Sequence, residues 1–419
     1  MSPRDRLLRR RVEQGYTLSE LMIAVLLTSL VVGALYRTSR SASETFNQQQ
    51  RIAETQLRLR FAAEQLRADI ARAGYMATPN SATDPKVCPR PTQVLQALSI
   101  ERDAPSIVPL ATDNQFISPV VLRMTGNYLS VDEYMVAGVD PSSGEIRLQN
   151  QTPQWARMTA EEFTRIFLAS ANNSGRMVRI TSPTGEMQFA LVVGGSFQSA
   201  NSTVLPVLRL QAPPTVVGAG ASSSTAGAGC GISGLGVGAT VAPITMVEYR
   251  LMNLSSNPVL ADLSPTDPVA AARKTDLVRV EYDLQPQPVL VPGSMRVVGE
   301  FAVDFDATVT VDDGFPIGSA TGPVTLRSFN YGDTDITTLM ANVQTAGLGT
   351  ARPQRVRSVS FRLSIRERDQ DPGFGWVARA SGAEALTRYR VFDNRIGAAR
   401  VRTVATDVVL PNLATRNLR

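Results

Sequence analysis

The sequence has no histidine, and it has only two lysines and two cysteines among its 419 residues. Histidine is the commonest general base and metal ligand near neutral pH, so its absence excludes His-containing triads and argues against most zinc sites. No nucleophile stands beside a base, and no two carboxylates form a recognisable catalytic pair. We therefore expect no enzymatic activity, no metal site and no cofactor.

Cysteine is too rare for a metal site built from four thiolates. The two residues, Cys88 and Cys230, can pair across a long loop if the protein folds in an oxidising compartment. The alternative is two separate, buried free thiols. The sequence leaves both open.

A surplus of charge is also missing. The formal net charge is +5. Five arginines (Arg4, Arg6, Arg9, Arg10 and Arg11) stand before Gly15 against two acidic residues there, so the remaining chain is close to neutral. This balance argues against a nucleic-acid partner.

The N-terminal region carries the clearest signal. No charged residue occurs from Leu21 to Tyr36, and with the residues from Tyr16 onward the segment approaches the roughly 20 residues of a membrane-spanning helix. The arginines before it favour a cytoplasmic N-terminus, with the chain after Tyr36 on the far side of the membrane.

Two details distinguish this segment from a secretory signal peptide. The charged leader ends at Gly15, directly before the apolar run, whereas a signal peptidase site follows that run. In addition, Glu20 lies within the apolar segment, where a carboxylate costs about 2.5–3.5 kcal/mol at a helix centre and less near an interface. The free-energy cost of a carboxylate in this segment indicates that Glu20 has a function. An uncleaved signal anchor, with Glu20 at the interface, is the plain alternative.

Gly15, the hydrophobic residue at 16 and the run Thr17-Leu18-Ser19-Glu20-Leu21 resemble the processing site of type IV prepilins and pseudopilins. The resemblance implies cleavage after Gly15 by prepilin peptidase, N-methylation of Tyr16 and a role for Glu20 in filament assembly. The amine of Tyr16 in one subunit and Glu20 in its neighbour would then neutralise each other. Tyr16 replaces the usual phenylalanine but keeps an aromatic ring.

The helix is predicted to continue through residues 37–74. Apolar residues recur there at helical spacing, no proline occurs between Pro3 and Pro79, and Gly74 is suited to end the helix. The apolar positions are Leu59, Ala62, Ala63, Leu66, Ile70 and Ala73. We expect residues 1–15 to be the leader, 16–36 the transmembrane and filament-core helix, and 37–74 its continuation.

Residues 75–419 are predicted to form a β-rich domain on the periplasmic or extracellular side. Short β-branched runs separated by Gly, Pro, Asn and Asp indicate antiparallel strands. The fold class is therefore α+β and pilin-like, with a long N-terminal helix packed on a largely antiparallel sheet. Predicted strands cover residues 120–124, 177–181, 187–193, 203–210, 245–251, 277–284, 301–311 and 356–366, and residues 381–392 form a short helix or another strand.

The Gly/Ser-rich segment 218–239 is predicted to be a mobile loop or linker, with a surface element that binds a partner as the alternative. It lacks the Lys-Ser/Thr of a phosphate-binding loop. Cys230 within it is the candidate tether to Cys88.

Two acidic or mixed-charge runs are candidate sites. Asp304, Asp306, Asp312 and Asp313 could suggest calcium, but a solvated strand and turn explains them more simply. Residues 366–371 are predicted to be a charged loop.

Several downstream segments resemble PilW-type minor pilins and the related J-type minor pseudopilins. The resemblance lies in the strand VEYRL followed by LVRVEYDL, and in later runs; these are residues 247–251, 277–284, 301–314, 356–369, 388–392 and 408–413. It implies a minor pilin that helps to prime or cap a type IV pilus.

The expected partners are other minor and major pilins, prepilin peptidase, the inner-membrane assembly platform and membrane lipid. The expected location is the inner membrane, as a single-pass protein, and then the pilus at the cell surface. The alternatives are a minor pseudopilin of a type II secretion system and a pilin-anchored adhesin or binding module.

Overall fold

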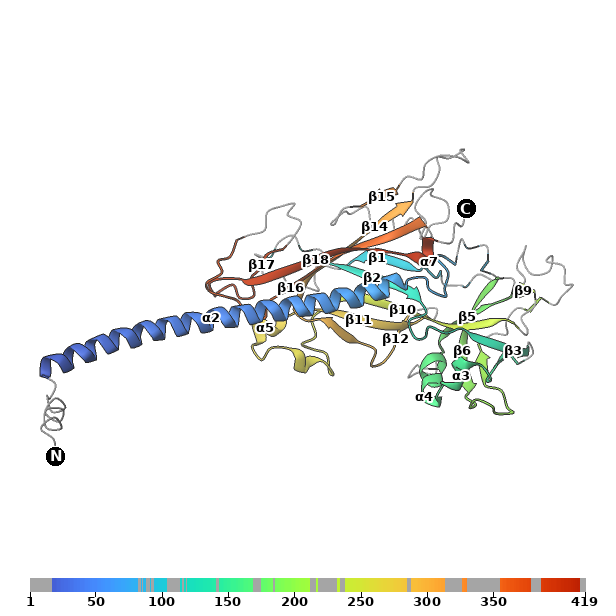
Figure 1. The fold of residues 1–419 in the computed structure, drawn as a ribbon. Helices are drawn as coiled ribbons and strands as arrows, with labels where there is room; N and C mark the ends of the chain where they lie inside the picture. The colour runs from blue at the N-terminus through green and yellow to red at the C-terminus, as the bar shows by residue number, and fades with distance from the viewer. Residues whose placement is uncertain are drawn as a thin grey trace, which may run out of the picture. The chain divides into compact units, whose positions relative to one another are not determined.

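A computed structural model provides the fold (Figure 1). It describes residues 17–81, 84, 86–87, 91, 94–103, 114, 117, 119–140, 143–168, 175–183, 185–211, 216–217, 232–233, 238–284, 288–312, 326–329, 355–377 and 386–414. The leader, Gly15, Tyr16, Cys88, Cys230 and Asp313 lie outside the described residues.

One long helix, α2 (Leu18–Ala71), opens the described chain. It ends at Ala71 rather than at the predicted residue 74, and a turn follows. Gly74 lies in that turn with a φ of 74°, the left-handed conformation in which glycine avoids the penalty paid by other residues. The chain divides into two compact units, Met1–Gln56 and Leu57–Arg419. The last turns of α2 therefore belong to the second unit.

The second unit is mostly antiparallel β-structure, which confirms the predicted fold class. Among the described residues, eleven strands pair in one sheet and five in another. The first sheet contains β1 (Leu98–Arg102), β2 (Val120–Gly126), β3 (Tyr134–Asp140), β4 (Glu145–Leu148), β5 (Met177–Thr181), β6 (Met187–Ser196), β7 (Val207–Leu210), β10 (Thr240–Met252), β11 (Asp276–Asp283), β12 (Val289–Leu290) and β13 (Arg296–Gly299).

The second sheet has the strand order β15-β14-β16-β18-β17. Its strands are β14 (Ala302–Asp312), β15 (Leu326–Ser328), β16 (Val356–Arg366), β17 (Arg388–Tyr389) and β18 (Ala399–Val409). The short helices are α3 (Pro153–Ala156), α4 (Ala160–Phe163), η1 (Thr164–Leu168), η2 (Ala261–Leu263), α5 (Pro268–Ala272) and α7 (Pro411–Ala414).

Strand β10 belongs to two halves of the first sheet. Its C-terminal half pairs with β2 on one edge and with β11 on the other. Its N-terminal half pairs instead with β3 and β5. An ion pair of 3.3 Å between Arg176 and Asp283 shows that β5 begins where β11 ends. We call β1, β2, β11 and the C-terminal half of β10 the helix-bound sheet.

The chain leaves the helix-bound sheet after β2 and returns to it in β10, and residues 127–239 between them form what we call the inserted lobe. Figure 1 shows β3, β5, β6, α3 and α4 gathered at one end of the domain. The lobe has its own core, with Tyr134, Trp155, Phe163 and Phe167 at its centre. These rings meet mostly edge to face, with centroids 5.1–6.0 Å apart. The insertion accounts for much of the length of the domain.

The main core joins α2 to both sheets. All six positions of the predicted apolar stripe are buried in it; five lie on α2, and Ala73 lies in the turn that follows. The sheets contribute alternate residues, such as Leu122 of β2, Tyr249 of β10, Phe305 of β14 and Phe361 of β16. Figure 1 shows both sheets alongside the last turns of α2, which belong to the second unit. The sequence pattern of the helix thus identified the face on which the domain is built.

Most predicted strands are confirmed within a few residues, and two predictions about charge are wrong. Asp304 and Asp306 are buried on β14, where Arg362 approaches both, rather than solvated. Arg366 and Glu367, predicted to lie in a charged loop, are also buried at the end of β16. In each case a neighbouring part of the chain covers the polar face of the strand. The alternation of polar and apolar residues along one strand cannot predict that burial.

The other predictions have mixed outcomes. The segment 203–210 forms a strand only from Val207, after Pro206, because proline cannot donate to a ladder. In the Gly/Ser-rich segment 218–239, Ile232–Ser233 forms β9, parallel to β8 (Val216–Val217); most of that segment lies outside the described residues. Of residues 381–392, Arg388–Tyr389 forms β17.

Candidate functional site

The apolar start of α2 is fully exposed. Every residue from Leu18 to Tyr36 has an exposed side chain. Within the part of the chain that the structure describes, α2 is the helix long and apolar enough to cross a membrane, by length and composition. A continuous exposed apolar surface of this kind indicates a membrane anchor.

Glu20 closes the N-terminal end of this helix. Its Oε2 accepts hydrogen bonds from the Thr17 amide (3.0 Å) and the Thr17 hydroxyl (2.9 Å). In return, the Glu20 amide donates to the Thr17 hydroxyl at 3.3 Å. This reciprocal arrangement is a capping box, which satisfies amide donors that have no partner within the helix. The Thr-x-x-Glu spacing encodes it, and the sequence analysis missed that signal.

The cap determines what Glu20 can do. Its carboxylate is held by the amide and the hydroxyl of Thr17. The structure places Glu20 but neither Gly15 nor Tyr16, which lie outside the described residues. The candidate disulfide between Cys88 and Cys230 lies outside them as well.

A family model described as the prokaryotic N-terminal methylation motif matches residues 10–36. This is a type IV pilin-like N-terminus. The motif indicates a type IV pilin or pseudopilin that prepilin peptidase processes. No curated protein and no solved structure matches the chain.

The pilin-like helix is fastened to its domain through a buried carboxylate. Asp69 of α2 accepts hydrogen bonds at Oδ2 from the Tyr249 hydroxyl (2.8 Å) and from Arg279 Nε (2.7 Å). Tyr249 and Arg279 stand directly opposite each other on β10 and β11. The Tyr128 hydroxyl donates to the Asp69 carbonyl at 3.0 Å. We call Asp69, Tyr249 and Arg279 the helix clamp.

The protonation states of the clamp are fixed by its surroundings. Burial, with the Asp69 carboxylate, raises the pKa of Tyr249 well above its ordinary value, so the phenol keeps its proton. Burial alone would lower the pKa of Arg279, but Asp69 and Glu281 outweigh it and raise that pKa. Tyr249 therefore donates to Asp69 as a neutral phenol, and Arg279 keeps its positive charge. Both strands carry the family resemblance in the sequence, but what their Tyr and Arg bind is visible only in the structure.

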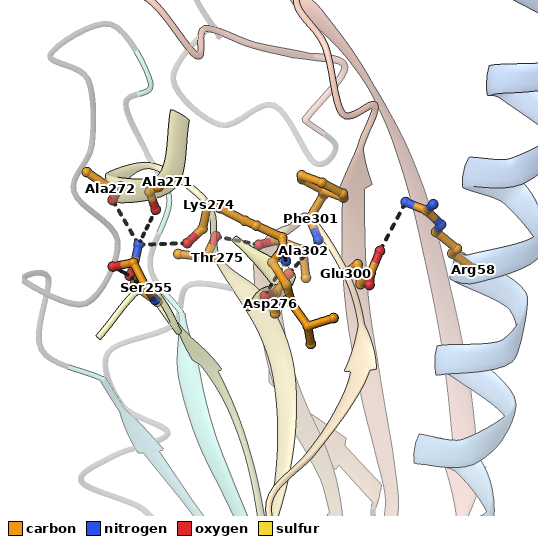
Figure 2. Close-up of polar contacts among 12 residues, drawn as sticks. Arg58, Ser255, Ala271, Ala272, Lys274, Thr275, Asp276, Glu300, Phe301 and Ala302 are labelled. Atoms are coloured by element: carbon orange, nitrogen blue, oxygen red, sulfur yellow. Dashed lines mark hydrogen bonds and ion pairs between the residues drawn. The ribbon is translucent and has the colours of Figure 1, made fainter. Parts of the chain in front are cut away.

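A second cluster of polar contacts lies near the start of the second unit and includes Arg58 of α2 (Figure 2). Arg58 forms an ion pair of 3.4 Å with Glu300. Next to it, Lys274 Nζ donates to Asp276 Oδ2 at 2.8 Å, and the Phe301 amide donates to Asp276 Oδ1 at 2.9 Å. Burial raises the pKa of Asp276, and Lys274 partly opposes that shift.

Phe301 lies at the centre of this cluster in an unusual conformation. Its φ is 57°, which is uncommon for a bulky residue. The bond from its amide to Asp276 holds the backbone, while Lys274 and Arg366 lie over its ring at 4.9 Å and 5.0 Å from the centroid. Cations over an aromatic face are attracted to it. The cluster fixes the turn that joins β13 to β14, and hence the first sheet to the second.

A groove lies on the face of the helix-bound sheet that points away from α2. Its volume is about 580 Å³. On its floor, Arg123 Nε donates to Glu248 Oε2 at 2.7 Å, while Arg123 NH1 donates to Glu101 Oε2 at 2.6 Å. The neighbouring Arg250 approaches Glu248 and Asp103. Arginines therefore neutralise these carboxylates, which do not form the convergent acidic set of a cation site.

The described residues contain no group of three or more His, Cys, Asp or Glu side chains placed to hold a metal ion. What the described geometry provides is an exposed apolar anchor with a capped carboxylate at its start. It also provides a domain bound to the same helix by buried charges.

Proposed function

We propose that this chain is a minor pilin that helps to prime or cap a type IV pilus. The observation that carries the proposal is the methylation motif at residues 10–36, on a helix whose later turns are clamped into a β domain. In a subunit with both features, the position of the helix in a helical bundle determines the position of the domain.

The proposed mechanism begins with a membrane-held precursor. The leader stays in the cytoplasm, prepilin peptidase cuts after Gly15, and Tyr16 is N-methylated. Glu20 then exchanges its bonds to Thr17 for the amine of Tyr16 in a neighbouring subunit. This exchange replaces a cap within one chain by a charge pair between two chains. A desolvated charge pair is strongly favoured over either charge alone in an apolar bundle.

The partners of this function are other minor and major pilins, prepilin peptidase, the inner-membrane assembly platform and membrane lipid. The domain would lie in the periplasm before assembly and at the cell surface afterwards. Neither enzymatic activity nor nucleic-acid binding enters the mechanism. If Cys88 and Cys230 pair, they do so on the oxidising side of the membrane.

Replacement of Glu20 by Leu tests the assembly role. Leucine keeps the apolar span but removes both the cap and the partner for the amine. We expect the Glu20→Leu chain to be cleaved and to stay in the membrane, with at least a tenfold loss from sheared surface filaments. Thr17→Ala, which removes the two hydrogen bonds of the Thr17 hydroxyl but keeps the carboxylate, is the matched control and should still assemble. Equal amounts of Glu20→Leu and native chain in filaments would contradict the proposal.

The same strains separate the pilus from a secretion-system pseudopilus. A deletion that removes surface pili and leaves protein secretion intact supports the minor pilin. A deletion that abolishes secretion while pili remain normal supports the minor pseudopilin instead.

A binding module on a pilin stalk is the second candidate, and the inserted lobe favours it. A pocket of about 410 Å³ lies where the lobe meets the end of α2, with Arg72, Arg157, Arg165, Asp132 and Glu162 among its lining residues. Loss of surface adhesion in a strain that still assembles normal pili would support this candidate over the assembly role.

A further inference from the structure

The pocket where the inserted lobe meets the end of α2 has a volume of about 410 Å³ and three arginines in its lining, Arg72, Arg157 and Arg165. Among the described residues, none of the three forms an ion pair with a carboxylate. In the groove on the helix-bound sheet, by contrast, Arg123 bonds to two carboxylates. Three guanidinium groups that share a pocket and have no counter-ion in the described chain offer hydrogen-bond donors to an anion from outside.

Arg72 is held in place by the backbone and by two aromatic rings. Its Nη2 donates to the carbonyl oxygens of Asn127 at 2.6 Å and Ser130 at 3.2 Å. Its guanidinium carbon lies 5.9 Å from the ring centroid of Tyr75 and 5.6 Å from that of Tyr128, a distance at which a ring attracts a cation. Within the described residues, the hydrogen bonds of the guanidinium use Nη2 alone. The side chain is therefore preorganised, with Nε and Nη1 left to bind a ligand.

Arg157 and Arg165 stand on short helices that are anchored in the core of the lobe. Arg157 ends α3, two residues after the buried Trp155. Arg165 lies in η1, directly before the buried Ile166. The turn η1 is π-helical, a form that often occurs as a single turn at functional sites. Both arginines are exposed, so the lobe presents two guanidinium groups to solvent on a rigid base.

The pocket also contains hydrogen-bond acceptors and a neutral donor. Asp132 and Glu162 line it, and Glu162 Oε2 accepts a hydrogen bond from the Thr159 amide at 3.2 Å. Burial raises the pKa of Tyr134, so this lining phenol keeps its proton and can donate. The three arginines and two carboxylates of the lining give a net charge of +1. The pocket therefore suits a ligand with one anionic group and several hydroxyls.

We propose that this arginine pocket, lined by Arg72, Arg157 and Arg165, binds a carboxylated sugar such as a uronic acid unit of an acidic polysaccharide. A planar guanidinium can bind a carboxylate through two parallel hydrogen bonds. Sugar hydroxyls both donate and accept, which matches the lining phenol and carboxylates. The apolar part of the lining, with Met158 and Ile166, can pack against the C–H face of the sugar ring. The volume lies within the range of about 300–1,000 Å³ that is usual for small-ligand sites.

A nucleic acid fits the arginine pocket less well. Its backbone carries a phosphate at every nucleotide, and proteins bind it with an extended basic surface. The two carboxylates of the lining would repel the phosphates on either side of a bound one. The inference gives a ligand to the second candidate function above, and it does not depend on the role of the chain in assembly.

Isothermal titration calorimetry on the full chain in detergent micelles tests the ligand. We expect a galacturonate trimer to bind at least tenfold more tightly than its methyl ester, which has the same rings without the charge. Inorganic phosphate and a single-stranded oligonucleotide are the competing probes, and both should bind more weakly than the trimer. Equal binding of acid and ester, tighter binding of either competing probe or no binding of the trimer would overturn the proposal.

Two variants test the location of the site. Arg157→Gln with Arg165→Gln removes two exposed cations, so the urea midpoint should change little, while the trimer should bind at least tenfold more weakly. Arg147→Gln removes an exposed arginine of the lobe, on β4 and outside the pocket lining, and is the matched control. The control should bind the trimer as the native chain does. Equal losses of affinity in the two variants would mean attraction to charge without a site, and would overturn the proposal.

Filament assays separate this inference from the assembly function. The Arg157→Gln, Arg165→Gln chain should enter sheared filaments as the native chain does, because the substitutions leave Glu20 in place. If the trimer fails to bind while Glu20→Leu is excluded from filaments, the arginine pocket alone is wrong. If the trimer binds while Glu20→Leu enters filaments normally, the assembly function is wrong and the pocket is confirmed.

Discussion

The helix-bound sheet and the inserted lobe share strand β10 but are stabilised in different ways. The helix-bound sheet grips α2 through buried charges, with Asp69 bonded to Tyr249 and Arg279. The core of the lobe is built from aromatic and aliphatic side chains, and among the described residues it includes none from α2. The buried charges of the helix-bound sheet fix α2 in one register. The inserted lobe can fold around its own apolar core.

This difference indicates a division of labour. Buried charge pairs add little net stability compared with apolar packing, but they penalise every arrangement that separates them. A helix that could slide along an apolar sheet is held in place by such pairs. A lobe inserted between two strands needs only a stable core.

The largest expected effect comes from removal of one clamp partner. Arg279→Met would leave Asp69 buried without its cation, which costs about 3–5 kcal/mol in comparable buried pairs. The free energy of unfolding from urea titration of the soluble domain measures it. Arg209→Met, which removes an exposed ion pair with Glu145 in the lobe, is the control and should cost about 1 kcal/mol or less. Similar losses of unfolding free energy in the two variants would contradict the proposed difference between the helix-bound sheet and the inserted lobe.

An effect of similar size but different location is expected for Trp155→Ala. Trp155 is buried between Tyr134 and Phe163, and its Nε1 donates to the Gln198 carbonyl at 2.8 Å. Truncation of a buried tryptophan costs about 3–5 kcal/mol. Hydrogen exchange should show loss of protection in β3, β4 and β7, with protection of α2 and β11 retained. Equal loss of protection in both regions would show that the lobe is not independent.

A smaller effect is expected for Tyr249→Phe, which keeps the ring and the Asp69–Arg279 pair. The loss of one hydrogen bond to a charged acceptor costs about 1.5–3 kcal/mol. The double variant Tyr249→Phe with Arg279→Met should cost less than the sum of the single changes, because both groups bind the same carboxylate. Strict additivity would argue that the clamp is not a unit.

The smallest effect concerns pH at the junction of the two regions. Burial raises the pKa of Asp283 to about 6, against a partial opposing effect from Arg176 and a reinforcing one from Glu281. The folded protein therefore holds this proton more tightly than the unfolded chain, whose aspartate has a pKa of about 3.9. The stability from Asp283 is full below about pH 3.9 and is lost as the pH rises through about 6.

The asparagine of the Asp283→Asn variant cannot ionise, so the variant should lose this pH dependence of the free energy of unfolding. Urea midpoints at pH 4, 5, 6 and 7 for both chains give the comparison. The native chain should lose stability relative to the variant across this range. A constant difference between them would mean that the Arg176–Asp283 pair stays fully ionised.

The sequence predicted local features well and non-local ones poorly. The five buried stripe positions on α2 follow from helical spacing, and strands such as Met177–Thr181 and Val356–Arg366 follow from runs of β-branched residues. The sharing of β10 depends on pairing between distant segments, which no local pattern encodes. The burial of Asp304 and Asp306 likewise depends on what covers their strand face.

The candidate site shows the same limit. Glu20 stood out because a carboxylate is costly in an apolar helix. Asp69 did not stand out, because it sits among charged residues on an ordinary amphipathic stretch, and its partners lie far along the chain. The Tyr and Arg strands were recognised as a pattern, and only the structure shows that they meet at one helix residue.

Mass spectrometry of the N-terminal peptide, from membrane and sheared-surface fractions, tests the central claim most directly. The account predicts a peptide that begins at methylated Tyr16, and its presence in sheared filaments as well as in the membrane. A chain that still begins at Met1, in cells that process other prepilins, would contradict it and leave a signal-anchored protein.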